Sequence, residues 1–469
     1  MTDAHIAYLR SAFAEFDEGF YEYLANLSCK DVRVYAPHEG SVVFPREPLL
    51  RVEGPLAVCQ LLETPLLTLI NYAALVATNA TRMRMAAGKD KVMLEFGLRR
   101  AQGPDGGVTA SRSAMVGGFD ATSNVAAGFT YGIAIKGTHA HAFVSAFNGI
   151  ADIRYGHLRP ADASPSTANG SGDDFTGLVL EIRSELGFGA THEGELAAFI
   201  SYACCYPKNA LLLVDTYDTL SSGVLNFLCV AIALVRLGYR PVGIRLDSGD
   251  LSYLSKECRR VIDATAKRVG IDLSYVKIAA SNDLNEETIH SLNLQGHSID
   301  VFGIGTHLVT CQKQPALGCV FKLVELNGKP RIKLSQSLNK IPIPGRKRVY
   351  RLYGEAGKAI CDLMDLATNP PPQVGQKLLA RHPFDQHKRV YIIPRKVEEL
   401  QQLVYDGAQT CPPLTVDAAR EHLHDNLDTV REDHLRGLNP TPYKVSVTEA
   451  LYAFMVDLID KNAPVQVLA

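Results

Sequence analysis

Residues 239–251 read Tyr-Arg-Pro-Val-Gly-Ile-Arg-Leu-Asp-Ser-Gly-Asp-Leu, a short apolar stretch that runs directly into polar residues. Val242, Ile244 and Leu246 are apolar, which predicts a buried strand. The Ser-Gly pair ends that strand, and Asp250 can cap a helix that begins at the next residue. The stretch therefore predicts one unit of strand, turn and helix.

Function concentrates at the carboxyl ends of the strands in such units. Arg245, Asp247 and Asp250 occupy that position here. An isolated Arg-Leu-Asp would more often be an ion pair across a loop. The recurrence of similar polar strand ends elsewhere in the chain favours a functional site.

Seven such units follow one another with short linkers, which favours a closed parallel barrel over an open doubly wound sheet. The expected strands cover residues 93–96, the surroundings of Phe119, and residues 133–135, 211–214, 242–246, 275–280 and 301–302. We therefore expect an α/β fold with an irregular, TIM-like α/β barrel. An open parallel sheet is the alternative. Residues 159–174 are rich in Pro, Ser, Asn and Gly and predict a surface loop.

The rest of the chain has the punctuation of antiparallel strands and should form an open α/β sandwich domain with a helical C-terminal region. Expected strands cover residues 32–35, 41–44, 49–52, 319–325, 331–334, 349–353, the surroundings of Leu363 and residues 390–393, and expected helices cover residues 3–27, 55–78, 397–403, 418–427 and 447–459. The helix at 55–78 is apolar on most sides and should be buried. We divide the chain into residues 1–60 (lead-in and part of the sandwich), 61–316 (barrel), 317–395 (rest of the sandwich) and 396–469 (mainly helical).

The composition fits a cytosolic protein. The 469 residues have a formal net charge of -2 with both signs mixed, which argues against nucleic acid and membrane partners. None of the ten cysteines forms a C-x-x-C pair, as expected for reduced thiols. The amino end has no signal peptide pattern, and the apolar runs look too short to cross a bilayer.

The turn Gly303-Ile304-Gly305-Thr306 ends the last expected barrel strand. Two glycines let backbone N–H groups approach an anion closely, and the Thr hydroxyl adds a donor. Alone, this motif is more often an ordinary tight turn. Its place after the last barrel strand, where phosphate sites are common, favours phosphate binding.

Acidic residues at three strand ends should meet at the barrel mouth: Asp215, Asp218, Asp247, Asp250 and Asp283. They could hold Mg²⁺ through water, accept hydrogen bonds from sugar hydroxyls, or stabilise a cationic transition state. Asp218 and Asp250 are as readily helix caps. Asp247 lies on the strand side of its turn and is the stronger functional candidate.

His139 and His141 follow another strand and allow two interpretations. Both could be ligands of a metal-dependent hydrolase, but the other strand ends supply only His307 as a further imidazole. Alternatively, one histidine is a nucleophile or proton carrier. Arg99, Arg100 and Arg245 complete the mouth and indicate a substrate with several negative charges. The residues thus predict a barrel enzyme for an anionic, phosphorylated sugar, without a P-loop.

Six blocks, in this order and spacing, resemble the nicotinate phosphoribosyltransferase family. They read Leu-Arg-Arg-Ala-Gln-Gly-Pro-Asp-Gly-Gly at 98–107, Gly-Gly-Phe-Asp-Ala-Thr-Ser-Asn at 117–124, Gly-Thr-His-Ala-His at 137–141, Asp-Thr-Tyr-Asp at 215–218, Arg-Leu-Asp-Ser-Gly-Asp at 245–250 and Gly-Ile-Gly-Thr at 303–306. The likeness runs from about residue 32 to the C-terminal region. It implies transfer of phosphoribosyl from phosphoribosyl pyrophosphate to nicotinate, coupled to ATP hydrolysis with Mg²⁺ or Mn²⁺, in a homodimer with shared active sites.

The resemblance also implies roles for individual residues. His141 is similar to the histidine that ATP phosphorylates, and Asp247 to the ribose contact. The implied substrate-binding residues are Thr138 and Arg245 for nicotinate, Gly303, Gly305 and Thr306 for the 5′-phosphate, and Arg99 and Asp250 for further substrate contacts. Asp215 and Asp218 could hold Mg²⁺ through water.

The amino end departs from the family pattern, because no Thr-Asp-Leu-Tyr helix with a ring-stacking Tyr precedes the first strands. We therefore expect either a shortened form or a misplaced start codon. Two alternatives remain open at this point: a catalytically impaired paralogue that dimerises, and a phosphoribosyltransferase for nicotinamide.

Overall fold

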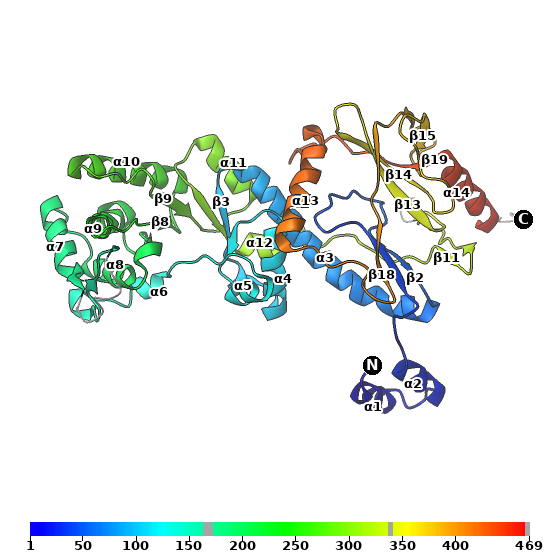
Figure 1. Cartoon of the computed structure of the whole chain (residues 1–469), viewed down its shortest axis with the longest axis horizontal. Coiled ribbons are helices and arrows are strands. Elements are labelled where there is room, and N and C mark those ends of the chain that lie inside the picture. Colours follow the sequence, from blue (N-terminus) through cyan, green and yellow to red (C-terminus); the bar gives the residue numbers. More distant parts are fainter. Residues whose placement is uncertain (163–171, 336–340, 465–469) are drawn as a thin grey trace, which may run out of the picture. The chain divides into compact units, whose positions relative to one another are not determined.

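The computed structural model describes residues 1–162, 172–335 and 341–464, and it divides into two compact units (Figure 1). One unit is Ala73–Ala316, and the other combines Met1–Tyr72 with Leu317–Ala469. The centre of the expected loop, residues 163–171, lies outside the described residues. Our four-part division of the chain stays a prediction.

The unit Ala73–Ala316 is built on a curled sheet of parallel strands in the order β4-β3-β10-β9-β8-β7. The strands are β3 (Val92–Glu95), β4 (Ala121–Thr122), β7 (Leu211–Leu213), β8 (Gly243–Leu246), β9 (Lys277–Ala280) and β10 (Val301–Ile304). In register, Ile244 pairs with Leu212 on one side and with Ile278 on the other. All three side chains are buried or nearly so, as the apolar pattern of a strand covered on both faces predicts.

The segment from Ile135 to His139 continues this sheet through one β-bridge and two hydrogen bonds that involve side chains. Ile135 forms a single parallel bridge with Thr122 at one edge. Beyond it, Thr138 Oγ1 donates to the carbonyl oxygen of Leu211 at 2.5 Å, and the N–H of Leu213 donates to His139 Nε2 at 3.3 Å. The prediction of an irregular α/β barrel is therefore confirmed, in the form of a curled, parallel half-barrel sheet. The strand expected around Phe119 lies two residues later, and the one at 133–135 is reduced to this bridge.

Helices cover the outside of the sheet, as the labels of Figure 1 show. They are α4 (Gly103–Val116), α5 (Val125–Tyr131), α6 (His141–Val144), α7 (Phe175–Leu186), α8 (Glu193–Cys205), α9 (Val224–Arg236), α10 (Leu251–Val269), α11 (Glu286–Gln295) and α12 (Thr306–Thr310). Helix α9 is apolar apart from Asn226 and Arg236, and it is almost wholly buried. Helix α10 follows the opening stretch, with Asp250 as its N-cap and Gly270 as its left-handed C-cap.

The second unit contains two larger sheets and a hairpin. A three-stranded antiparallel sheet has the order β18-β1-β2, and a six-stranded mixed sheet has the order β16-β15-β19-β14-β13-β17. The strands are β1 (Arg33–Ala36), β2 (Arg51–Glu53), β11 (Glu325–Leu326), β12 (Lys329–Pro330), β13 (Lys347–Tyr353), β14 (Ala359–Leu366), β15 (Leu378–Arg381), β16 (Arg389–Ile392), β17 (Lys396–Glu399), β18 (Gln402–Asp406) and β19 (Val445–Thr448). Asn327 and Gly328 have φ of 51° and 72°, so they form the tight turn that joins β11 and β12.

Helices α1 (Asp3–Ala12), α2 (Glu18–Ala25), α13 (Val416–Thr429) and α14 (Glu449–Asn462) complete this unit. Leu451 and Met455 of α14 pack on Val349, Met364 and Val447 of the six-stranded sheet. A sheet with a helix on its face is the expected open sandwich.

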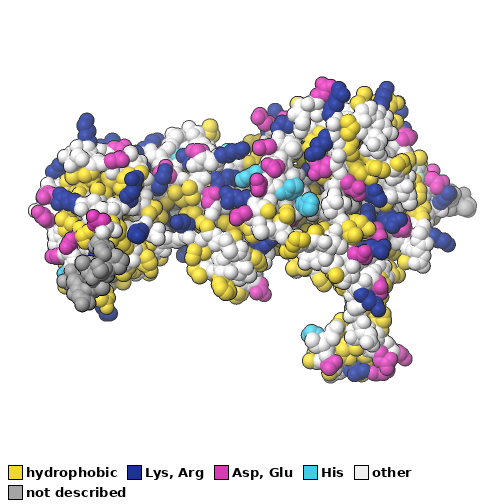
Figure 2. Space-filling model, in the orientation of Figure 1, with side chains coloured by type: hydrophobic (Ala, Val, Ile, Leu, Met, Phe, Trp, Pro, Cys, Tyr) yellow, Lys and Arg dark blue, Asp and Glu magenta, His cyan; other side chains and the backbone are white. Residues whose placement is uncertain are grey.

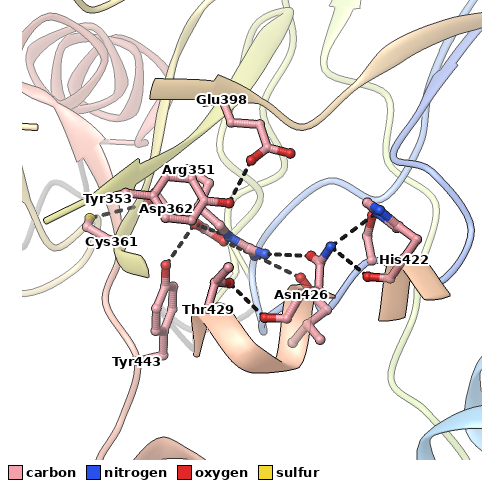
Figure 3. A network of polar contacts seen from close by, with 11 residues as sticks. Arg351, Tyr353, Cys361, Asp362, Glu398, His422, Asn426, Thr429 and Tyr443 are labelled. Atoms are coloured by element: carbon pink, nitrogen blue, oxygen red, sulfur yellow. Dashed lines mark hydrogen bonds and ion pairs between the residues drawn. The ribbon is translucent and has the colours of Figure 1, made fainter. Parts of the chain in front are cut away.

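A buried ion pair joins two strands of the six-stranded sheet (Figure 3). Arg351 and Asp362 are on the paired strands β13 and β14, both fully buried, with Arg351 Nη2 2.6 Å from Asp362 Oδ2. Tyr443 donates its hydroxyl to Asp362 at 2.9 Å, and Arg351 reaches Asn426 on α13. The network ties the sheet to a helix and to the segment before β19.

Several expectations about this part of the chain are wrong. Residues 41–44, 319–324 and 331–334 form no strand, and the helix expected at 397–403 is replaced by the strands β17 and β18. The segment pairs with β13, and this strand pairing outweighs the preference of its long polar side chains for a helix. Helix α3 (Leu56–Ala87) is one long helix, but Leu56, Leu61 and Leu69 on it are 42%, 47% and 71% exposed.

The expectation that apolar runs are too short for a bilayer also needs correction. By length and composition alone, residues 56–87 and 219–236 could each cross a membrane. In the second, 72% of the apolar window is buried inside the protein, as in a core helix, against 11% in the first. On the face drawn in Figure 2, Lys and Arg are interspersed with Asp and Glu, in keeping with the low net charge.

Candidate active site

Asp215 and Asp247 meet at the carboxyl ends of the neighbouring strands β7 and β8. Asp215 Oδ2 accepts the N–H of Asp247 at 2.9 Å and also the hydroxyl of Ser248. Ser281, after β9, donates its hydroxyl to Asp247 Oδ1. The two carboxylates are thus fixed by three successive strand ends, and each keeps one oxygen without such a bond.

His141 faces these free oxygens. Its Nε2 lies 3.5 Å from Asp247 Oδ2 and 3.8 Å from Asp215 Oδ1, and its Nδ1 lies 3.1 Å from Thr216 Oγ1. The imidazole is 43% exposed, whereas the Asp215 side chain is 2% exposed. An accessible ring held from both nitrogens suits a reacting group better than a core residue.

His139 points into the protein instead. Its ring packs against Phe143, Phe199 and Tyr202, with centroid distances of 5.3, 6.1 and 4.7 Å. Burial, with a smaller contribution from the charge of Arg245, lowers the pKa of His139 to about 4. His139 is therefore a neutral, packed residue, and the two histidines do not share a metal-binding face.

Arg245 is largely buried at the end of β8. Burial lowers the pKa of its guanidinium, and the carboxylates of Asp247 and Asp215 oppose that effect. Its Nε is buried and has no hydrogen-bond partner among the described residues. Arg99, in the short 3-10 turn Leu98–Arg100, is exposed and close enough to contribute unfavourable charge. Two arginines at one mouth provide the charge for an anionic substrate.

Asp218 and Asp250 act as caps. Asp250 Oδ1 accepts the N–H of Tyr253 at 2.9 Å, and Asp218 Oδ1 accepts the N–H of Ser221 at 2.7 Å. Thr138, expected at the substrate, uses its hydroxyl on the carbonyl of Leu211. The substrate contacts assigned to these three residues stay predictions, but each has a structural use as well.

Phe96 packs closely against Gly303 and Gly305 of the turn 303–306, so packing also limits which residues fit there. A Cβ on Gly303 would lie 2.6 Å from the ring of Phe96, and one on Gly305 would lie 3.1 Å from the carbonyl oxygen of Phe96. Substituting Gly305 would therefore disturb the backbone after β3 as well as any anion. Thr306, the first residue of α12, is a cleaner position for testing phosphate binding.

Glu95 is a residue of the site that sequence reasoning missed. It is fully buried at the end of β3, and its carboxylate accepts from the N–H of Gly97, Ser111 Oγ at 2.8 Å and Thr122 Oγ1 at 2.5 Å. These bonds fix the turn that carries Arg99 and the neighbouring strand β4. An acidic residue inside an apolar strand was the available signal.

Glu195, on α8, was missed as well. It is fully buried, and its Oε2 accepts from Ser222 Oγ at 2.6 Å and from Asn226 Nδ2 at 2.9 Å. Burial raises the pKa of Glu195 to about 7; the two hydrogen bonds oppose this rise, and the charges of Asp215 and Asp218 add to it. Only the fold shows that this helix residue lies near the strand ends.

The acidic residues allow a limited fit to Mg²⁺. Across residues 1–162, 172–335 and 341–464, no group of three or more His, Cys, Asp or Glu side chains could hold a metal ion. Mg²⁺ commonly keeps several waters and binds one or two carboxylates together with substrate phosphates. Asp215 and Asp247 each have one oxygen free for that purpose, whereas Asp218 is engaged as a cap.

Two family models match the chain. The model of the nicotinate phosphoribosyltransferase N-terminal domain matches residues 1–71, and that of the C-terminal domain matches residues 346–455. Family likeness thus begins at residue 1, and our expectation that it starts near residue 32 is wrong.

Curated relatives match along nearly the whole chain. A nicotinate phosphoribosyltransferase 1 of Arabidopsis thaliana is 51% identical over 99% of this chain and 84% of the relative. A nicotinate phosphoribosyltransferase of Homo sapiens is 42% identical over 99% and 87%. The crystal structure of human nicotinic acid phosphoribosyltransferase superposes with a TM-score of 0.84 at 40% identity, covering 98% of this chain and 89% of that one.

Proposed function

This chain belongs to the nicotinate phosphoribosyltransferase family, and we propose that it joins nicotinate to the phosphoribosyl group of phosphoribosyl pyrophosphate. The products are nicotinate mononucleotide and pyrophosphate, in NAD biosynthesis. The observation that carries this proposal is His141 held between Asp215, Asp247 and Thr216 at a barrel mouth that also contains Arg245.

Arg245 binds the carboxylate of nicotinate. A guanidinium in a largely buried position is costly to leave unpaired, and its free Nε can donate to a planar carboxylate. A neutral amide would compensate that charge less well, so this site favours nicotinate over nicotinamide. Thr138 lies on the neighbouring segment and contributes to the same pocket.

Asp247 stabilises the ribosyl group as pyrophosphate leaves. The bond to the leaving group breaks while positive charge develops on the sugar, and a fixed carboxylate lowers the energy of that state. Asp247 is fixed, because Asp215 and Ser281 hold its main chain and side chain. The turn of Gly303, Gly305 and Thr306 binds the 5′-phosphate through backbone N–H groups and a hydroxyl.

ATP phosphorylates His141 and thereby couples its hydrolysis to synthesis. When Nδ1 carries the proton and donates it to Thr216 Oγ1, Nε2 keeps a lone pair that can attack the γ-phosphorus of ATP. The N–P bond forms as the bond from that phosphorus to the bridging oxygen breaks, and ADP leaves. Nε2 is also the nitrogen that faces Asp215 and Asp247. Phosphorylation would place further negative charge beside two carboxylates.

Mg²⁺, or Mn²⁺, offsets that charge when bound. Asp215 and Asp247 would hold it together with water and substrate phosphates, with Asp218 as a more distant acidic neighbour. Arg99 and Asp250 provide further contacts to the phosphoribosyl substrate.

We also propose a cytosolic homodimer whose subunits share their active sites. The low net charge and the ten free cysteines suit a reducing compartment. The exposed Leu56, Leu61 and Leu69 on α3 provide apolar surface that a second copy would cover. Leu69→Glu should then shift the mass measured by light scattering from dimer toward monomer.

The direct test is an assay of purified protein with nicotinate, phosphoribosyl pyrophosphate and Mg²⁺, with and without ATP. The proposal requires nicotinate mononucleotide and pyrophosphate in equal amounts, with more product when ATP is present. Activity on nicotinamide alone would assign the protein to the other substrate. Binding of both substrates without turnover would identify an impaired paralogue.

A further inference from the structure

Glu195 is the centre of a buried polar network that lies outside the catalytic groups. Its Oε2 accepts from Ser222 and Asn226, and Asn226 Nδ2 also donates to the carbonyl oxygen of His192 at 3.0 Å. The N–H of His192 donates to Ser222 Oγ at 3.0 Å, and the N–H of Glu195 donates to His192 Nδ1 at 3.1 Å. The four residues therefore hold one another in place.

This network reaches the catalytic loop through a ring contact. His192 stacks on Tyr217, with ring centroids 3.7 Å apart and planes at 15°. Tyr217 is the neighbour of Thr216, which bonds His141, and lies two residues from Asp215, which holds Asp247. A shift of His192 would consequently move the segment that places both reacting side chains.

A second path runs through the main chain. Ser222 lies in a π-helical turn, Thr219–Gly223, whose N–H groups at Ser222 and Gly223 both donate to the carbonyl oxygen of Asp218. The next residue, Gly223, approaches Val214 so closely that a Cβ would overlap the Val214 carbonyl. Single π turns of this kind are frequent at functional sites. Displacing Ser222 would thus press on the residue that precedes Asp215.

We propose that Glu195 is a positioning residue for the loop 215–218, acting through Ser222, Asn226 and the His192–Tyr217 stack. It touches no reacting atom. One carboxylate oxygen of Glu195 accepts hydrogen bonds from both Ser222 and Asn226. Through them it keeps Thr216 next to His141, and Asp215 at the N–H of Asp247. The inference rests on the proposed function for its catalytic consequence, but its structural part does not.

Two substitutions separate this role from simple destabilisation. Glu195→Ala removes the shared acceptor, whereas Glu195→Gln keeps one oxygen in its place. Ile200→Val, a buried apolar change on the same helix that removes no polar group, is the matched control. Hydrogen exchange of peptides covering residues 211–223 is measured without substrates, and the yield of nicotinate mononucleotide per ATP hydrolysed is measured with them.

Glu195→Ala should speed exchange of the 215–223 amides at least tenfold and lower the product yield per ATP at least threefold. Glu195→Gln should restore both values to within twofold of the wild type, and Ile200→Val should change neither. The ratio of product to ATP does not depend on how much protein is folded, so an unchanged ratio in Glu195→Ala overturns the proposal. Failure of Glu195→Gln to rescue also overturns it. A wild type without any synthesis refutes the proposed function instead, and the exchange result still decides the role of Glu195.

Discussion

Asp215 Oδ2 accepts the main-chain N–H of Asp247 at 2.9 Å, so the end of one barrel strand holds the turn that follows the next strand. Asp247 depends on this bond for its position opposite His141. The acidic residue that we propose contacts the substrate, Asp247, is thus held in place by a second acidic residue, Asp215.

Substitutions at Asp215 can separate its acceptor from its charge. Asp215→Asn can keep an oxygen toward the N–H of Asp247, whereas Asp215→Ala loses it. A charge-assisted hydrogen bond contributes about 1.5 to 3 kcal/mol. We expect Asp215→Ala to lower kcat/KM roughly tenfold to 100-fold, and Asp215→Asn to lower it less. Equal losses in steady-state assays of the two variants would mean that the negative charge beside His141 matters and the hydrogen bond to the N–H of Asp247 does not.

Arg245 should decide between nicotinate and nicotinamide. Losing its pairing with a carboxylate should weaken nicotinate binding by about 1.5 to 3 kcal/mol and leave nicotinamide binding almost unchanged. Isothermal titration of Arg245→Ala with both ligands measures this difference. Arg240→Ala is the matched control, because Arg240 precedes the same strand and stacks on Tyr275 at 3.9 Å. A nicotinate preference that survives in Arg245→Ala would assign recognition to another group.

The phosphorylated residue should be His141. With γ-labelled ATP and a basic quench, an acid-labile and base-stable phosphate should appear on the peptide containing residues 137–143. The label should disappear in His141→Ala, because His139 is enclosed by aromatic rings and cannot receive a phosphate. His139→Phe, which keeps a packed ring, should retain it. Label on the His141→Ala protein would contradict the assignment.

The sequence predicted the barrel and the position of its mouth better than it predicted the side chains that support the site. Polar residues that follow an apolar run mark the end of a strand, which is why the sequence indicated Arg245 and Asp247 as candidates for the site. Glu195 lies in the middle of a helix, and its partners are Ser222 and Asn226, about thirty residues away. Such a network depends on how α8 and α9 pack, and no local pattern carries that information.

Local preference also failed where sheet pairing decides the conformation. Residues 397–403 include long polar side chains that suit a helix, but β17 pairs with β13 from Lys396 to Glu399. The exposure of α3 was missed for a different reason: an apolar helix can be covered by its own fold or by another molecule, and composition is the same in both cases.

The buried pair of Arg351 and Asp362 should be essential to the second unit. Asp362→Asn would leave a buried guanidinium without its counter-charge and should lower the free energy of unfolding by about 3 to 5 kcal/mol.

Burial and the neighbouring Asp362 raise the pKa of Glu47 to about 10, so that carboxyl is neutral at pH 7. Glu47→Gln should therefore change stability by less than about 1 kcal/mol. Alkylation of the buried Cys361 during urea unfolding reports on this unit, and a large effect of Glu47→Gln would show that its carboxyl is charged.

Glu195 should make the stability of the barrel unit depend on pH. Its pKa is raised from 4.5 to about 7 in the folded protein, so the folded state holds the proton more tightly than the unfolded state. The resulting stabilisation is complete below about pH 4.5 and is lost as pH rises to about 7; the full effect is on the order of 3 kcal/mol. Glu195→Gln cannot titrate, so the difference in unfolding free energy, wild type minus variant, should fall across this window and stay constant above it. Ser222→Ala removes a bond that lowers the pKa of Glu195 and should move the end of the window to higher pH. The reaction of Cys229 and Cys258, both buried in this unit, with a dithiodipyridine, which modifies exposed thiols at acid pH as well, measures unfolding at each pH. A difference that is flat from pH 4.5 to 7 would show that Glu195 is ionised throughout and held by more hydrogen bonds than those from Ser222 and Asn226.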